Sequence, residues 1–163
     1  MPGLSHSLVE RKYAGSLGAM FDPELPLEAP RLDVLVVEDD AADTRLIQTA
    51  LRRHRDIGHI TTRNLPGRAL LELSAGRLSP GLVLLDILMP RLDGFQFLEV
   101  MRRVPSMATV PVVFLTTSTA TRDVKRANDT GAFGYIVKPD SYEELEARVG
   151  AIIKKAVYGL NGR

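Results

Sequence analysis

The most restrictive stretch of the chain is a short apolar run, Leu82–Leu85, that ends in a single carboxylate, Asp86. Pro80-Gly81 precedes the run and Pro90 follows it, a pattern typical of a strand buried on both faces. An ionised carboxylate is expensive to bury, so we expect Asp86 at the carboxyl end of this strand, where a loop and water can reach it. In open α/β sheets this edge binds ligands. A strand-end Asp that only caps the next turn is the alternative at this point.

Other short apolar runs divide the chain in the same way, and stretches of helical periodicity separate them. Strands are predicted at residues 34–37, 60–63, 82–85, 111–115 and 135–137. Helices are predicted to begin near Asp40, Ala69, Gly94, Thr121 and Ser141. Strands that alternate with helices in this way predict an α/β fold with right-handed crossovers, a doubly wound parallel sheet and helices on both faces.

The first predicted helix has the clearest pattern. Asp40 is its expected N-cap, and Asp43 falls in its first turn, where a carboxylate suits the helix dipole. The helix is expected to end at Gly58. Four residues at helical spacing predict one buried stripe: Leu46, Ile47, Ala50 and Leu51.

Residues 1–30 differ from the rest of the chain, because glycine, serine and repeated proline leave no room for a regular element. We expect a flexible N-terminal extension there; an ordered arm that packs on a partner is the alternative. Residues 31–158 form the predicted domain, and residues 159–163 form a short C-terminal tail. A chain of 163 residues suits one domain with a substantial core.

Charge and cysteine content argue against several function classes. The formal net charge is +1, whereas nucleic-acid-binding and membrane-surface proteins usually carry a concentrated basic excess. The sequence contains no Cys, so neither a disulfide framework nor a thiolate metal site is expected. No apolar stretch approaches the roughly 18 residues of a membrane helix, and no signal-peptide pattern is recognisable. We therefore expect a cytoplasmic protein.

The strongest predicted strands each deliver a chemically useful residue at the carboxyl end. Glu38 and Asp39 follow the first strand, Asp86 follows the third, Thr116 follows the fourth and Lys138 follows the fifth. The carboxyl ends of parallel strands lie along one edge of a sheet. We therefore expect these five side chains to converge.

Three converging carboxylates need a cation, because two of them about 4 Å apart repel by about 4 kcal/mol at an effective dielectric constant of about 20. Oxygen ligands without His or Cys favour a hard ion such as Mg²⁺, which often bridges to a phosphate. Asp86 is the candidate nucleophile toward phosphorus, and Glu38 with Asp39 is the candidate metal pair. Lys138 would neutralise phosphoryl charge, and Thr116 would donate a hydrogen bond to a phosphoryl oxygen.

Four motifs occur together in this chain: VVEDD at residues 36–40, LLDILMPRLDG at 84–94, LTTS at 115–118 and GYIVKP at 134–139. Together they resemble the receiver domain of bacterial two-component response regulators, over residues 32–156. The resemblance implies a flavodoxin-like sheet with strand order 2-1-3-4-5. It also implies a single-domain signalling protein that catalyses only its own phosphorylation and dephosphorylation.

The resemblance implies roles for individual residues. Asp86 would accept a phosphoryl group from a sensor histidine kinase or a histidine phosphotransfer protein. Mg²⁺ would be held by four groups: Glu38, Asp39, Asp86 and the backbone carbonyl of Leu88. The family usually has a cis peptide before the proline that matches Pro139, and this peptide would orient the lysine.

The same resemblance implies how the signal leaves the site. Thr116 and Tyr135 would act as the switch, the hydroxyl moving toward the phosphoryl group and the aromatic ring turning inward; an ordinary half-buried strand aromatic is the alternative for Tyr135. The apolar Leu88 gives no help to an attacking water, so we expect a phosphoryl lifetime of minutes or longer. Residues 38–46 and 115–118 are similar to stand-alone regulators that partner bacterial phytochromes and related sensor kinases.

Three rival interpretations are weighed against this one. A phosphohydrolase of the dehalogenase type also forms an aspartyl-phosphate, but it carries a second acid two residues after the nucleophile, where this chain has Leu88. A phosphate-independent docking module would not need the charged groups that are all present. The third rival is a regulator whose output domain has been removed.

The expected output is contact with another protein. Homodimerisation would use the face formed by the fourth helix, the fifth strand and the fifth helix. Arg122, Lys125 and Arg126 are expected to be exposed there, while Val157 and Leu160 extend the apolar face of the last helix.

Overall fold

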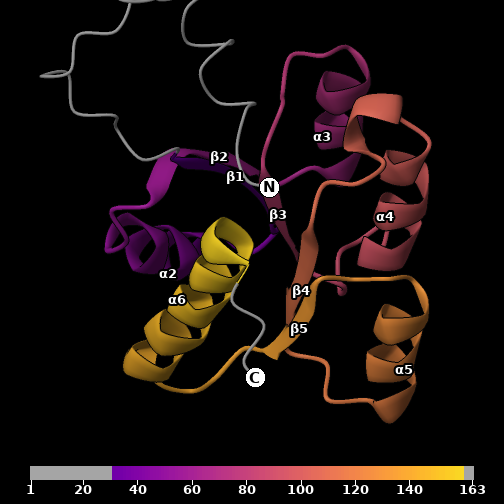
Figure 1. Cartoon of the computed structure of the whole chain (residues 1–163). Helices are drawn as coiled ribbons and strands as arrows, with labels where there is room; N and C mark the ends of the chain where they lie inside the picture. Colours follow the sequence, from indigo (N-terminus) through magenta and orange to yellow (C-terminus); the bar gives the residue numbers. More distant parts are fainter. Residues whose placement is uncertain (1–30, 160–163) are drawn as a thin grey trace, which may run out of the picture.

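The computed structural model describes residues 31–159, so the expectations for residues 1–30 and for Leu160 lie outside the described residues. Five parallel strands form one sheet in the order β2-β1-β3-β4-β5, which confirms the predicted α/β fold and strand order (Figure 1). The strands are β1 (Leu32–Val37), β2 (Ile57–Arg63), β3 (Leu82–Leu85), β4 (Val112–Thr116) and β5 (Gly134–Val137). The helices are α2 (Ala41–Arg52), α3 (Pro66–Ser74), α4 (Gly94–Arg102), the 3₁₀ turn η1 (Pro105–Met107), α5 (Thr121–Asp129) and α6 (Tyr142–Tyr158).

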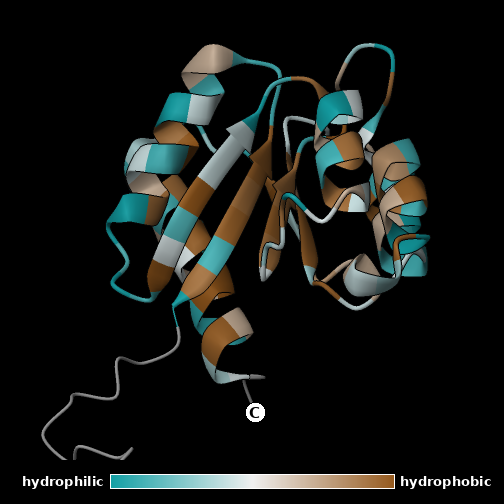
Figure 2. Ribbon diagram, turned by 90° about the horizontal axis from the view of Figure 1, so that it is seen from above, coloured by the Kyte–Doolittle hydropathy of each residue, from teal (hydrophilic) through white to brown (hydrophobic). Residues whose placement is uncertain are grey.

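The sheet is covered on both faces (Figure 1). Helices α3, α4 and α5 pack on one face against strand residues that include Leu35 and Phe114. Helices α2 and α6 pack on the other face against residues that include Val34 and Leu84. Successive strand residues point to opposite faces, so the inner strands β3 and β4 are buried along their whole length, whereas the edge strand β2 carries polar residues. Figure 2 accordingly shows much of the sheet in brown, with teal and white bands. Among the described residues, no helix combines the length and the apolar composition needed to span a membrane.

Helix α2 differs from its prediction at two points. Leu46 is 46% exposed, whereas Ile47, Ala50 and Leu51 are buried as expected. At 3.6 residues per turn Leu46 lies about a quarter turn from the centre of that stripe, which explains its exposure. The helix also ends at Arg52 rather than at Gly58, because the chain from Ile57 onward pairs with β1 as the edge strand β2.

Caps define where the helices begin. The side chain of Asp40 accepts a hydrogen bond from the N–H of Asp43, which confirms the predicted N-cap of α2. Asp93 and Gln96 form a reciprocal capping box at the start of α4. At the start of α6 the Ser141 side chain accepts a hydrogen bond from the N–H of Glu144. These caps fix the first turns of the helices that begin near the carboxyl edge of the sheet.

Candidate functional site

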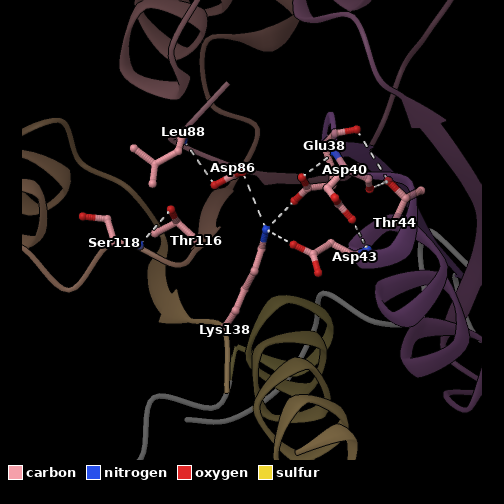
Figure 3. Close-up of polar contacts among 9 residues, drawn as sticks. All are labelled: Glu38, Asp40, Asp43, Thr44, Asp86, Leu88, Thr116, Ser118 and Lys138. Carbon is pink, nitrogen blue, oxygen red and sulfur yellow. Dashed lines mark hydrogen bonds and ion pairs between the residues drawn. The ribbon is translucent and has the colours of Figure 1, made fainter. Parts of the chain in front are cut away.

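Strand pairing brings the predicted residues to one edge of the sheet. Val37 of β1 pairs with Leu85 of β3, so the residues that follow them, Glu38 and Asp86, come out side by side. Thr116 at the end of β4 pairs with Val137 of β5, and Lys138 follows directly. Figure 3 shows Glu38, Asp86, Thr116 and Lys138 around one space.

Three carboxylates lie close together at this edge. Glu38, Asp39 and Asp86 each offer an oxygen, and these oxygens lie within 4.8 Å of one another. Glu38 and Asp86 are buried, with 2% and 6% of their surface exposed, whereas Asp39 is exposed. Their mutual repulsion and their all-oxygen character fit a hard divalent cation such as Mg²⁺.

Lys138 supplies the positive charge among these acids. Its Nζ lies 2.6 Å from Glu38 Oε2 and 3.6 Å from Asp86 Oδ2 (Figure 3). It also lies 2.8 Å from Asp43 Oδ2, a contact that the sequence interpretation did not predict. The lysine side chain is 11% exposed, so these contacts lie largely out of water.

Burial and ion pairing shift the titration of this pair. Burial raises the pKa of Glu38 to about 7, although its hydrogen bond with Lys138 acts in the opposite direction. Burial alone would lower the pKa of Lys138, but the bonds to Asp43 and Glu38 outweigh it and leave the pKa above its usual value. The Lys138 ammonium is therefore charged at neutral pH, whereas the carboxyl group of Glu38 titrates near neutral pH.

The peptide between Lys138 and Pro139 is trans, since the described chain contains no cis peptide bond. The expectation of a cis peptide, which came from the family resemblance, is therefore wrong for this structure. The trans form is the lower-energy one for most bonds before proline. Here the ion pairs with Glu38 and Asp43 direct the lysine side chain.

The loop after β3 is held close to Asp86 by backbone contacts. The N–H of Leu88 donates to Asp86 Oδ1 at 3.3 Å, and the N–H of Gly94 donates to the carbonyl of Ile87 at 3.0 Å. A Cβ on Gly94 would lie 2.4 Å from the carbonyl oxygen of Asp86, so only glycine fits there. The side chain of Leu88 is 56% exposed.

Thr116 and Tyr135 are connected through the loop that follows β4. Thr116 is fully buried, and its Oγ1 accepts a hydrogen bond from the N–H of Ser118 at 3.3 Å. The Tyr135 hydroxyl donates to the carbonyl of Ser118 at 2.9 Å, and the Ser118 hydroxyl bonds the carboxylate of Asp123 in α5. Burial raises the pKa of Tyr135. The switch role of Thr116 and Tyr135 stays a prediction, but both contact the same loop residue.

Asp43 is the residue of this site that sequence reasoning missed. It was assigned only to the first turn of α2, where its charge suits the helix dipole. The signal that could have found it is the Asp40 N-cap, because a capped first turn places the third helical residue beside the end of β1.

Comparison with known proteins finds a family match that covers the sheet and the candidate site. The response regulator receiver domain family matches residues 34–150. The probable methanogenesis regulatory protein FilR2 of Methanothrix harundinacea is 36% identical over 124 residues, which are 73% of this chain and 79% of that protein. The DNA-binding dual master transcriptional regulator RpaA of Synechocystis is 32% identical over 75% of this chain, but the match spans only 49% of that protein. The chain thus spans most of FilR2 and about half of RpaA.

The structure is also similar to solved structures of response regulators. The phosphorylated cyanobacterial phytochrome response regulator RcpA superimposes with a TM-score of 0.71 at 27% identity, covering 80% of this chain and 97% of that one. The Mn²⁺-bound response regulator Rcp1 gives a TM-score of 0.70 at 28% identity, with the same coverage. A response regulator receiver domain from Rhodospirillum rubrum gives 0.65 at 32% identity, covering 78% and 93%.

Proposed function

Because the chain belongs to the response regulator receiver domain family, we propose that it accepts a phosphoryl group on Asp86 from a sensor histidine kinase or a histidine phosphotransfer protein. In this step an Asp86 oxygen forms the new P–O bond while the P–N bond to the donor imidazole breaks. The imidazole nitrogen keeps the electron pair of that bond. The product is an aspartyl-phosphate.

The observation that carries this proposal is the grouping of two further acids and one ammonium around Asp86. Asp86 lies within reach of Glu38, Asp39 and Lys138, and it is buried at the end of a strand. Lys138 can bond a phosphoryl oxygen after a short movement, and Thr116 offers a hydroxyl on the neighbouring strand. This arrangement suits phosphoryl transfer to one carboxylate.

Glu38, Asp39 and Asp86 would hold Mg²⁺, together with the backbone carbonyl of Leu88. The close carboxylate oxygens support this assignment, and a related response regulator, Rcp1, has been solved with Mn²⁺. When bound, the ion supplies charge neutralisation on the phosphoryl oxygens. Asp86 then keeps the role of nucleophile, and Lys138 orients the group that arrives.

We place the receiver domain at residues 31–158 and the protein in the cytoplasm, with signalling through protein contacts. Phosphorylation would draw Thr116 toward Asp86 and release Tyr135 from Ser118. The similarity to RcpA supports a sensor kinase of the phytochrome type as the donor.

The same signal would reach a partner or a second copy through α5, β5 and α6. Arg122, Lys125 and Arg126 are exposed on α5, and Val157 is half-buried on α6. Light scattering with and without phosphodonor tests for this dimer. A monomer under both conditions would contradict homodimerisation.

The central test is phosphorylation by a small phosphodonor with Mg²⁺, followed by mass spectrometry of the peptides. We expect one acid-stable, hydroxylamine-labile adduct on Asp86, none in Asp86→Asn, and a retained adduct with impaired signalling in Lys138→Ala. Asp140→Asn is the matched control, because Asp140 is exposed and its side chain makes no hydrogen bond or ion pair with other described residues. An adduct on another residue, or one that resists hydroxylamine, would contradict the proposal.

A further inference from the structure

The ammonium of Lys138 is held by two carboxylates other than the proposed phosphoryl acceptor. Its Nζ lies 2.6 Å from Glu38 Oε2 and 2.8 Å from Asp43 Oδ2, both within hydrogen-bond distance. The distance to Asp86 Oδ2 is 3.6 Å, which is too long for a hydrogen bond (Figure 3). The lysine therefore rests on Glu38 and Asp43, and only charge attracts it to Asp86.

The local structure at the start of α2 fixes the position of Asp43. Its N–H donates to Asp40 Oδ1 at 2.8 Å, and the N–H of Asp40 donates to Glu38 Oε1 at 3.0 Å. Glu38, Asp40 and Asp43 are thus linked in one chain of hydrogen bonds. A negative charge in this first turn interacts favourably with the helix dipole. Asp43 is placed beside Lys138 by the cap, and its side chain is 34% exposed.

A phosphoryl group on Asp86 would bind the same Lys138 ammonium that Asp43 now contacts. An ammonium has three N–H donors, and two of them already bond Glu38 and Asp43 at short distance. The third donor is left for a phosphoryl oxygen, and a movement of Nζ toward Asp86, from which it is 3.6 Å away, would lengthen its contact with Asp43. Asp43 is the more exposed of the two partners, and its negative charge also opposes an incoming phosphoryl anion.

We propose that Asp43 is a positioning residue that holds Lys138 in a resting place and competes with the phosphoryl group on Asp86 for its ammonium. The inference rests on the proposed function, since it concerns the same site. It assigns to Asp43 a restraint on phosphorylation, although Asp43 touches neither Asp86 nor the group that is transferred.

The rate of phosphorylation by a small phosphodonor tests this competition. Asp43→Asn removes the charge and keeps the shape of the side chain, so one of the two short contacts that hold Lys138 is weakened and the ammonium can move toward Asp86 more easily. Since a partly exposed ion pair contributes a modest free energy, we expect the rate to rise about two- to fivefold. Asp140→Asn removes the same charge two residues from Lys138 and should leave the rate unchanged.

A double-mutant cycle separates an effect through Lys138 from simple charge repulsion. If Asp43 acts through Lys138, the acceleration by Asp43→Asn should fall by at least half in a Lys138→Ala background. An unchanged or lower rate in Asp43→Asn would overturn the inference. So would an acceleration of equal size in the Lys138→Ala background.

A second measurement does not depend on phosphorylation. In ¹⁵N-labelled protein the ammonium of Lys138, protected by its two short bonds, should give a ¹H–¹⁵N signal. This signal should shift or exchange away in Asp43→Asn and stay in Asp140→Asn. Failure of the wild-type protein to be phosphorylated on Asp86 would refute the proposed function alone. An unchanged ammonium signal in Asp43→Asn would refute the role of Asp43.

Discussion

If Glu38 holds Mg²⁺ as proposed, a proton and the ion compete for the same carboxylate, and the affinity for Mg²⁺ should depend on pH. Burial raises the pKa of Glu38 to about 7, so we expect it to be about nine-tenths ionised at pH 8 and about one-tenth ionised at pH 6. If Mg²⁺ binds only the ionised form, its affinity should fall about tenfold between pH 8 and pH 6. Binding near pH 7 should also release a fraction of a proton.

The same shift sets the pH dependence of stability without the ion. The pKa of Glu38 in the folded protein lies above its ordinary value of 4.5, so the folded state favours the protonated acid. This contribution to stability is fully present below about pH 4.5 and is lost as the pH rises through about 7. Its size is on the order of 3 kcal/mol. The metal-free protein should therefore become easier to unfold in urea as the pH rises through this window.

Titration calorimetry of Mg²⁺ at pH 6, 7 and 8 measures the expected change in affinity. Two buffers with different ionisation enthalpies at pH 7 give the number of protons released. Glu38→Gln should bind the ion weakly and without pH dependence, while Asp140→Asn should behave as the wild type. A constant affinity from pH 6 to pH 8, or a pH dependence that persists in Glu38→Gln, would refute this reasoning.

Three further predictions concern two helix glycines and the lifetime of the adduct. Gly94→Ala should lower the free energy of unfolding by about 1–3 kcal/mol and weaken Mg²⁺ binding, because its Cβ would meet backbone atoms of Asp86; urea titration and calorimetry check both effects. Gly67→Ala, whose Cβ meets nothing within 4 Å in α3, should instead stabilise the protein by about 0.5–1 kcal/mol in the same urea titration, and a loss of stability there would contradict the comparison. Leu88→Asn should shorten the phosphoryl lifetime several-fold, because an amide can hold an attacking water; acid quenching over time measures this, and a wild-type lifetime of seconds would be evidence against the role of Leu88.

Much of the fold could be predicted from the sequence because the strands are short and sharply bounded. The run Leu82–Leu85 and its neighbours gave the alternation of strands and helices, while the strand order came from the resemblance of the motifs. Element boundaries were less predictable. Gly58 was predicted to end a helix, but it lies in β2, which pairs with β1. That pairing joins residues distant in sequence, and a local pattern does not contain it.

The candidate site was predictable for the residues that the strands carry. The backbone fixes where Glu38, Asp86 and Lys138 emerge, so their convergence follows from the parallel sheet. The direction of a side chain on a helix depends on the cap, and for this reason Asp43 was missed. The trans peptide before Pro139 was mispredicted because the expectation came from the family and not from the residues of this chain.

The pairing of the strands keeps three acids close together at this edge of the sheet. Hydrogen bonds along β1, β3 and β4 fix the backbone that carries Glu38 and Asp86, so the two chain segments do not separate to relieve the repulsion between the acids. Lys138 relieves part of it, and protonation of Glu38 relieves more. If Mg²⁺ binds Glu38 as proposed, it would displace the proton and compete with Lys138 for this carboxylate, and Asp43 would then be the remaining short contact of the ammonium.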